Sequence, residues 1–163
     1  MATVDLKDAV FTIKDGTGTA KTCTVVVGDG NIQFDESVNY QYLLDRGILD
    51  EVRLGDQVPV NVSFAFRWKY VVPATGHSGG EVVTPQDALR KRGAASTWVS
   101  SDKDTCKPYA VDLSVVLTAP CAGRTKTITL ADFRCEKLSY DIKAGSISAS
   151  GKCNITAPTI VNV

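Results

Sequence analysis

The clearest regularity in the chain is an alternation of apolar and polar residues over 58–70, interrupted only by Pro59 and Ala65. Polar residues such as Asn61, Ser63 and Arg67 stand between the apolar positions. The apolar positions are Val58, Val60, Val62, Phe64, Phe66, Trp68 and Tyr70. A period of two predicts a long β-strand with one buried and one wetter face. Residues 30–42 alternate in the same way, so the two segments are predicted to pair as one long antiparallel hairpin over 30–70.

The connection within this hairpin, residues 43–55, is unlike an ordinary loop, because large aliphatic residues alternate with charged ones. Its residues up to 54 are Leu43, Leu44, Asp45, Arg46, Gly47, Ile48, Leu49, Asp50, Glu51, Val52, Arg53 and Leu54. Two interpretations are open. The segment either folds back on its own core as a short amphipathic turn, or protrudes as an arm. Burying four aliphatic side chains in a partner would contribute about 6–12 kcal/mol before ordering costs, enough for stable association.

The rest of the chain predicts further strands and one helix. Strands are expected over 4–13 and 23–27, over 111–117, in KTITLADF, and in a C-terminal hairpin over 133–153 with its turn at 143–145. A short helix is predicted over 85–93, capped by Thr84, begun by Pro85 and ended by Gly93. We therefore expect a single domain over 1–163 that is mainly β. Its predicted form is a β-sandwich or half-barrel with a protruding hairpin loop and one short flanking α-helix.

The balance of charges and the lack of long apolar runs argue against two classes of function, tight DNA binding and membrane insertion. Eighteen Lys and Arg balance eighteen Asp and Glu among 163 residues, and no long basic run is present. This argues against tight, sequence-independent DNA binding, which needs a basic surface. No apolar run approaches the length of a membrane span, and the first residues do not resemble a secretory signal. We expect a protein made in a cytosol-like compartment, with no membrane partner.

Five cysteines lack any CxxC pair, so neither a zinc site nor a disulfide framework is indicated. The expected register of the C-terminal hairpin sets Cys135 opposite Cys153, within reach of a disulfide. The alternative is that both thiols stay reduced, as in most cytosolic products.

Three short motifs resemble catalytic or ligand-binding sequences. GHSGG at 76–80 matches the nucleophile elbow of serine hydrolases, but the single histidine, His77, is adjacent to Ser78 and is poorly placed to act as its base. DGTGTAKT has Asp15 and Ala20 where a phosphate-binding loop has glycines. Asp29 and Asn31 lack the later ligands of a calcium loop. We expect no enzymatic activity, no metal and no cofactor.

The order and character of several segments together resemble the tail tube proteins of tailed bacteriophages. These segments are the first hairpin followed by LGDQVPVNVSFAFRW, then TPQDALRKRGAASTW, then CKPYAVDLSVVL, and finally FRCEKLSYDIKAGSISASGKCN. The resemblance covers nearly the whole chain. It implies a structural virion protein that forms hexameric rings, whose inner sheets join into a β-barrel. The rings would stack into a helical tail tube, assembled in the host cytoplasm, that encloses the tape-measure protein and conducts the genome during ejection.

Carried onto this sequence, the resemblance assigns two surfaces. Residues 43–54 become the loop that reaches the adjacent ring, and the polar faces of the two long strands become candidates for lining the bore. The bore-lining candidates are Gln33, Asp35, Ser37, Asn39, Asn61, Ser63, Arg67 and Lys69. The implied partners are other copies of the chain, the tape-measure protein, the tail terminator and baseplate or tip proteins. Genomic DNA would pass without specific binding, which agrees with the zero net charge.

Other functions stay open from the sequence. A tail terminator or head-tail connector of similar fold would form one ring and would not polymerise. A monomeric β-sandwich binding module would use the loops 73–83 and 96–109, with Trp98 and Tyr109 stacking on a ligand. A hydrolase built on Ser78 is the third alternative. The sequence does not distinguish contractile from non-contractile tails.

Overall fold

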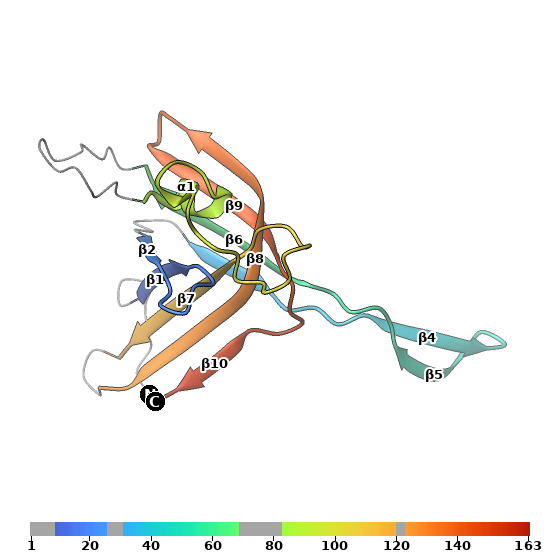
Figure 1. The fold of residues 1–163 in the computed structure, drawn as a ribbon. Helices are drawn as coiled ribbons and strands as arrows, with labels where there is room; N and C mark the ends of the chain where they lie inside the picture. Colours follow the sequence, from blue (N-terminus) through green and yellow to red (C-terminus); the bar gives the residue numbers. More distant parts are fainter. Residues whose placement is uncertain (1–8, 26–30, 69–82, 120–122) are drawn as a thin grey trace, which may run out of the picture.

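The computed structural model describes residues 9–25, 31–68, 83–119 and 123–163, and within these ranges the chain is mainly β-structure (Figure 1). This confirms the predicted fold class. The strands are β1 (Ala9–Lys14), β2 (Thr22–Val25), β3 (Ile32–Asp35), β4 (Tyr40–Asp45), β5 (Ile48–Leu54), β6 (Val60–Arg67), β7 (Val111–Thr118), β8 (Thr125–Asp141), β9 (Ser146–Cys153) and β10 (Thr159–Asn162). The described parts of the predicted strands 4–13 and 23–27 are strand, each with one further residue, Lys14 and Thr22, and the remaining predicted residues 4–8 and 26–27 lie outside the described ranges.

One eight-stranded antiparallel sheet forms the body, in the order β2-β1-β7-β8-β9-β6-β3, and β10 adds to β8. The long strand β8 spans 17 residues and pairs first with β7 and then with β9. Asp132 takes a positive φ of 55° inside β8, near the place where the β7 register shifts. The two segments predicted here as separate strands are therefore one strand with an irregularity at Asp132.

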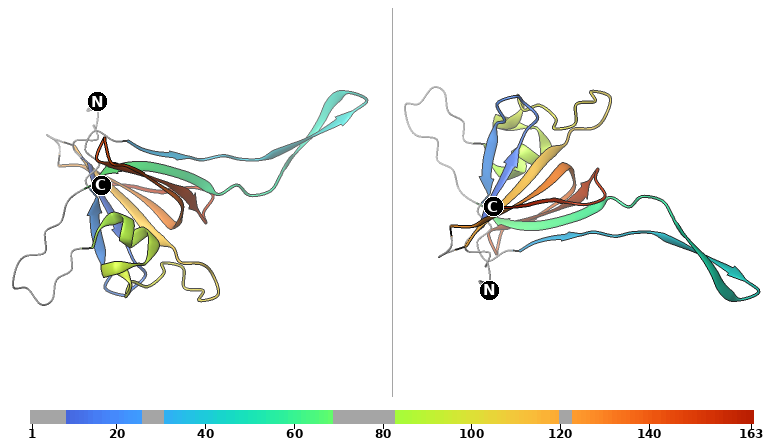
Figure 2. Two further views of the ribbon diagram at one scale, coloured as in Figure 1. Left: turned by 90° about the horizontal axis from the view of Figure 1, so that it is seen from above. Right: turned by 90° about the horizontal axis from the view of Figure 1, so that it is seen from below.

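The sheet curls so that its distant strands meet around one core (Figure 2). Three strands, β7, β8 and β9, lie between β1 and β6 in the sheet order, yet the rings of Phe11 in β1 and Phe64 in β6 have centroids only 5.0 Å apart in an edge-on arrangement. Phe64 also lies 6.0 Å from Phe133 of β8. Every second residue of β6, namely Val60, Val62, Phe64 and Phe66, is buried in this core. The alternation in the sequence thus correctly predicted the buried face of β6.

A short helix and a 3-10 turn cover part of the sheet. Helix α1 (Pro85–Arg90) buries Ala88 and Leu89, and η2 (Gly93–Ala95) follows it. The helix ends earlier than predicted, because Lys91 already takes the left-handed C-cap conformation. Thr84 occupies the N-cap position, but its hydroxyl makes no capping hydrogen bond, so that part of the prediction was wrong.

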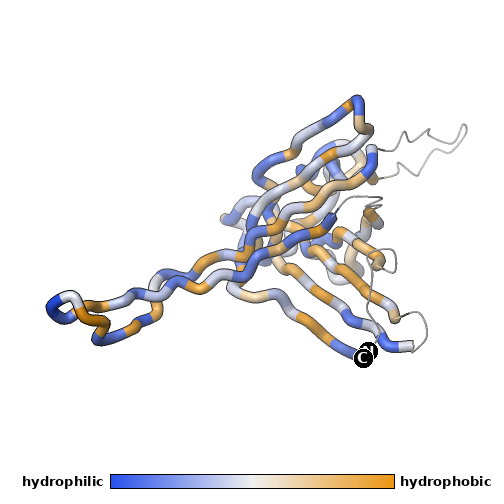
Figure 3. The backbone as a smooth tube through the Cα atoms, turned by 180° about the vertical axis from the view of Figure 1, so that it is seen from behind, coloured by the Kyte–Doolittle hydropathy of each residue, from blue (hydrophilic) through white to orange (hydrophobic). Residues whose placement is uncertain are grey.

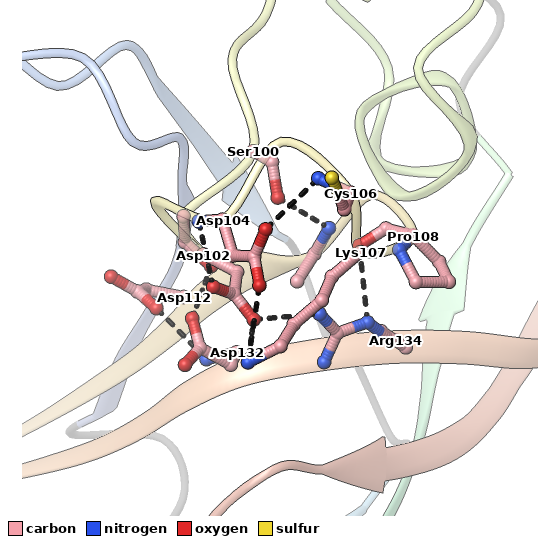
Figure 4. A network of polar contacts seen from close by, with 11 residues as sticks. Ser100, Asp102, Asp104, Cys106, Lys107, Pro108, Asp112, Asp132 and Arg134 are labelled. Atoms are coloured by element: carbon pink, nitrogen blue, oxygen red, sulfur yellow. Dashed lines mark hydrogen bonds and ion pairs between the residues drawn. The ribbon is translucent and has the colours of Figure 1, made fainter.

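A network of hydrogen bonds and ion pairs links the segment 102–108, which follows η2, to β8 (Figure 4). Arg134 donates from one guanidinium nitrogen to Asp102 at 2.9 Å and from another to the Pro108 carbonyl at 3.1 Å. Asp102 also accepts the Asp104 backbone N–H at 3.1 Å, and Lys107 approaches it at 3.7 Å. Hydrogen bonds from the Asp104 backbone and from Arg134 lower the pKa of Asp102, so its carboxylate stays ionised in the network.

Candidate assembly surfaces

Strands β4 and β5 form a two-stranded sheet of their own, which projects from the body as an arm (Figure 1). A tight turn at Arg46 and Gly47 joins them, and both residues take positive φ values, 51° and 81°. Such a pair of angles matches the twist of a hairpin and explains the glycine. The segment 43–54, predicted as a connecting loop, is thus mostly strand, and its register gives each side chain a defined face.

One face of the arm is apolar along its whole length. Tyr40 pairs with Leu54, Tyr42 with Val52, and Leu44 with Leu49. Because side chains alternate between faces, these six residues share one side of the ribbon. A bulge makes this possible, because Asp50 is an unpaired extra residue between Leu49 and Glu51. In a regular ladder Asp50 would pair with Leu44 and would place a charge on the apolar face.

The other face of the arm is largely polar. Gln41 pairs with Arg53 and Leu43 pairs with Glu51, and Arg53 and Glu51 form an ion pair at 3.0 Å. Figure 3 shows the resulting mixture of hydropathies along the arm. An amphipathic ribbon of this kind has one face suited to burial and one suited to water.

The apolar face of the arm is exposed in the isolated chain. Every residue of β4 and β5 is exposed, with Leu54 at 76% and Leu49 at 69%. The interpretation in which this segment folds back on its own core is therefore wrong. Within the described residues, the arm therefore has a large uncovered apolar surface. Because an isolated two-stranded ribbon is marginal in water, we expect the arm to gain stability from contact with another surface.

A second surface is the polar outer face of the strands β3, β6, β9 and β8. Cross-strand rows run from Gln33 through Ser63 and Ser150 to Lys137, and from Asp35 through Asn61 and Lys152 to Arg134. Shallow depressions follow these rows and are lined by all of these residues except Arg134. The surface is built mainly from small hydroxyl and amide side chains, with charges of both signs.

Four of the predicted bore-lining residues lie on this polar face: Gln33, Asp35, Asn61 and Ser63. Arg67 ends β6 in the same alternation. Ser37 and Asn39 are exposed in the segment that leads to the arm, and Lys69 lies outside the described residues. The same face also contains residues that the sequence analysis missed, namely Lys137, Ser139, Ser148, Ser150 and Lys152. The alternation within β8 and β9 does not show that β9 pairs with β6, so the sequence alone could not add these residues to the face.

The predicted register that set Cys135 opposite Cys153 was wrong: Cys153 lies opposite Phe133, and Cys135 lies opposite Gly151. The β8–β9 connection has four residues, 142–145, instead of the predicted three, which moves the register by one residue, and a bulge between Cys135 and Lys137 moves it by one more. Both thiols are free. Burial raises the pKa of Cys23 to about 11, and burial together with nearby carboxylates raises that of Cys153 to about 12, so neither forms a reactive thiolate at neutral pH.

The segment DGTGTAKT, which begins at Asp15 and resembles a phosphate-binding loop, forms a turn with a structural role. The Asp15 carboxylate is buried and accepts hydrogen bonds from the Lys21 N–H at 2.7 Å, the Thr17 hydroxyl at 2.8 Å and the Val99 N–H at 3.3 Å. A side-chain carboxylate therefore occupies the centre of this turn, where a phosphate-binding loop would hold phosphate. His77, Ser78 and Asp29 lie outside the described residues, and within the described ranges no cluster of metal-ligating side chains occurs.

The two aromatic residues proposed for ligand stacking are engaged by the body. Trp98 is 2% exposed and belongs to the core. Tyr109 donates its hydroxyl hydrogen to the Ala88 carbonyl at 2.9 Å, and burial raises its pKa. Both residues have structural contacts in the body, so they do not support the hypothesis of a binding module that stacks a ligand on them.

No helix in the described part of the chain has the length and apolar character needed to cross a bilayer. No family model matches the chain, and neither does any curated protein. Among solved structures, the chain is similar to the sheath/tube terminator of an extracellular contractile injection system, PVC, determined by cryo-EM in the extended state. The TM-score is 0.54 at 8% sequence identity, and the alignment covers 100% of this chain and 98% of that chain. At this identity the similarity shows a shared fold from end to end.

Proposed function

We propose that this chain is a non-enzymatic structural subunit of a phage-tail-like particle, where copies of it form rings around a conduit. The observation that carries the proposal is the arm, whose continuous apolar face is exposed in the isolated chain. Burial of that face in a neighbouring subunit would supply a large driving force for assembly. The end-to-end similarity to a terminator of a contractile injection system supports the same setting.

The fold comparison favours the position of a terminator, a single ring that ends a tube. The PVC protein is named as a sheath/tube terminator, and it matches this chain over nearly all of both lengths. In that position the arm would contact the last ring of a tube made from another protein. The other partners would be the components that join the end of the tail.

The tail tube is the second candidate, favoured by the arm and by the order of segments that resembles tail tube proteins. In that position hexameric rings would stack through the arm, as the resemblance implies. The tape-measure protein would lie within the tube during assembly, and terminator and baseplate proteins would contact its ends. The assembled protein would belong to the virion tail.

The polar outer face of β3, β6, β9 and β8 is the candidate conduit lining in both positions. A duct for DNA must not bind phosphates strongly, because each neutralised phosphate adds affinity and slows sliding. Hydroxyl and amide groups occupy four of the eight places in the cross-strand rows, and Asp35 shares a row with Lys152. Arg134 is paired with Asp102 at 2.9 Å, which leaves Lys137 as the one further base of the two rows.

Negative-stain electron microscopy and mass photometry of the purified chain over a concentration series test the proposal. Discrete rings that do not lengthen with concentration would identify a terminator-like subunit. Stacked rings or tubes with an open bore would identify a tube subunit. A chain that stays monomeric at the highest soluble concentration, with its arm still exposed to protease, would contradict ring formation.

A further inference from the structure

A second exposed apolar surface lies at the far end of the body, and we call it the distal rim: Trp68, Tyr140 and Ile142. The rings of Trp68 and Tyr140 lie 5.4 Å apart, and the two residues are 43% and 45% exposed. Ile142 is 82% exposed in the turn between β8 and β9. The carbonyl of Gly145 in that turn accepts the Trp68 N–H at 2.8 Å, which holds the turn beside the aromatic pair.

The arm and the distal rim lie at opposite ends of the same strand. Chain direction places the arm before Val60, where β6 begins, and Trp68 directly after Arg67, where β6 ends. Figure 1 shows the arm leaving the body on one side and the β8–β9 turn on the other. A copy displaced along this direction would bring its arm toward the rim of the next copy.

We propose that the apolar face of the arm of one subunit packs on the distal rim of a second copy of this chain. The inference rests on the proposed ring-forming function and deepens it, because it names the partner and the receiving surface of the arm. Aromatic rings and a branched aliphatic side chain are effective anchors for leucine and tyrosine side chains. Neither surface has another cover among the described residues.

Both surfaces carry charges of both signs. The arm tip has three acids, Asp45, Asp50 and Glu51, and two bases, Arg46 and Arg53. Near the rim, Arg92 donates to the Tyr140 hydroxyl at 2.9 Å and pairs with Asp87 at 3.4 Å, and Asp141 and Lys143 flank Ile142 in the sequence. Acids of one surface can therefore meet bases of the other, which would set the register of the contact more than its strength.

The symmetry of such a contact has a direct consequence. Arm-to-rim contact joins two different surfaces, so a pair of subunits keeps one free rim on the first subunit and one free arm on the second. Contacts of this type propagate into open stacks. The inference therefore favours the tube position over the terminator position.

Trp68 provides a spectroscopic test in the full chain. The protein has two tryptophans, and Trp98 is buried at 2% exposure, so a change in solvent access on association reports on Trp68. We expect a blue shift of emission and reduced acrylamide quenching as association proceeds in a concentration series. The Trp68→Phe variant should still associate but lose this signal.

Two complementary variants test whether the arm of one subunit contacts the rim of another. Leu49→Asp disables the arm and Ile142→Asp disables the rim, each by placing a charge in the proposed buried contact. Each alone should need at least about 100-fold more protein to stack. Mixed, they should form pairs of rings or subunits that do not lengthen, since one variant has an intact arm and the other an intact rim.

Two matched variants control for added charge. Gln41→Asp adds an acid to the polar face of the arm, and Val163→Asp adds one at a comparably exposed aliphatic residue, 80% against 82% for Ile142. Both should stack like the original chain. Circular dichroism and thermal unfolding check that all four variants keep their fold.

The outcomes separate the inference from the proposed function. Rings or stacks whose Trp68 remains fully quenchable, or variants that do not complement each other, would overturn the arm-to-rim contact and leave ring formation intact. Complementing pairs without rings would support the contact and contradict ring formation. Absence of all association, with Trp68 unchanged at every concentration, would count against both.

Discussion

Two antiparallel hairpins of this molecule follow the same alternating pattern and end in opposite environments. In β9, alternate residues are buried beneath the curled sheet, and Ile147, Ala149 and Cys153 are nearly inaccessible. In β4 and β5, the apolar face is just as continuous, yet every residue is exposed. Alternation therefore defines a face but does not show what covers it. In the body the cover is the chain itself, and for the arm we propose another subunit.

Truncation of a core residue should produce the largest effect on the isolated chain. Phe133 is 0% exposed and lies 6.0 Å from Phe64 across the curled sheet. Phe133→Ala should lower the free energy of unfolding by about 3–5 kcal/mol, because it removes buried area and leaves a cavity. Urea denaturation measures this loss. A loss below about 1 kcal/mol would show that the core is not closed in the way described.

Loss of the Asp15 carboxylate should have the next largest effect. Asp15→Ala would leave the N–H groups of Lys21, Val99 and Thr17 without their acceptor at the junction of two turns. We expect a cost of about 1–3 kcal/mol in the free energy of unfolding, measured by the same denaturation. Thr19→Ala is a suitable control, because the Thr19 side chain is exposed in the same turn.

The same carboxylate should make stability depend on pH. Burial alone would raise the pKa of Asp15, but the hydrogen bonds from Thr17, Lys21 and Val99 outweigh it, so the folded pKa lies below the ordinary value of 3.8. The unfolded state then binds the proton first. The stabilisation is complete above the unfolded pKa and is lost as the pH falls through the folded one. The stability difference between the original chain and Asp15→Ala should therefore shrink below about pH 4.

The sequence alone predicted the fold class, the long hairpin and the unusual segment at its tip. These features depend on local alternation, which is strong in β6. It did not predict that residues 43–54 are strands, because the turn residues Arg46 and Gly47 and the bulge at Asp50 interrupt the expected pattern. The predicted Cys135 and Cys153 register was wrong for a similar reason: the turn at 142–145 is one residue longer than predicted and a bulge follows at Cys135, and each extra residue changes every partner beyond it.

The candidate sites were predictable to a smaller extent, for a physical reason. The polar face combines strands that are distant in sequence, so Ser148 and Ser150 gain their place only through pairing with β6. Trp98 was considered as a ligand-stacking residue because burial depends on tertiary packing that sequence spacing does not reveal. The distal rim likewise arises from the contact of Trp68 with Tyr140, two residues from separate hairpins.

A substitution in the arm turn should act locally. Gly47 has a φ of 81°, and the space around it is open, so Gly47→Ala introduces backbone strain without a steric clash. We expect a cost of about 1 kcal/mol confined to the β4–β5 ribbon. Native-state hydrogen exchange should show faster exchange of amides in residues 40–54 and unchanged protection in β8 and β9. Equal changes in both regions would mean that arm and body unfold together.

The smallest effect on the isolated chain is expected at the most exposed apolar residue of the arm. Leu54 is 76% exposed, so Leu54→Ala removes little buried area, and the free energy of unfolding of the monomer should change by less than about 0.5 kcal/mol. In the assembled state the same truncation should weaken association, because Leu54 lies on the face proposed to be buried there. Denaturation of dilute protein and mass photometry of concentrated protein measure the two quantities separately. A variant that is destabilised as a monomer but assembles normally would mean that the arm contributes to its own domain, and the contrast with the body would disappear.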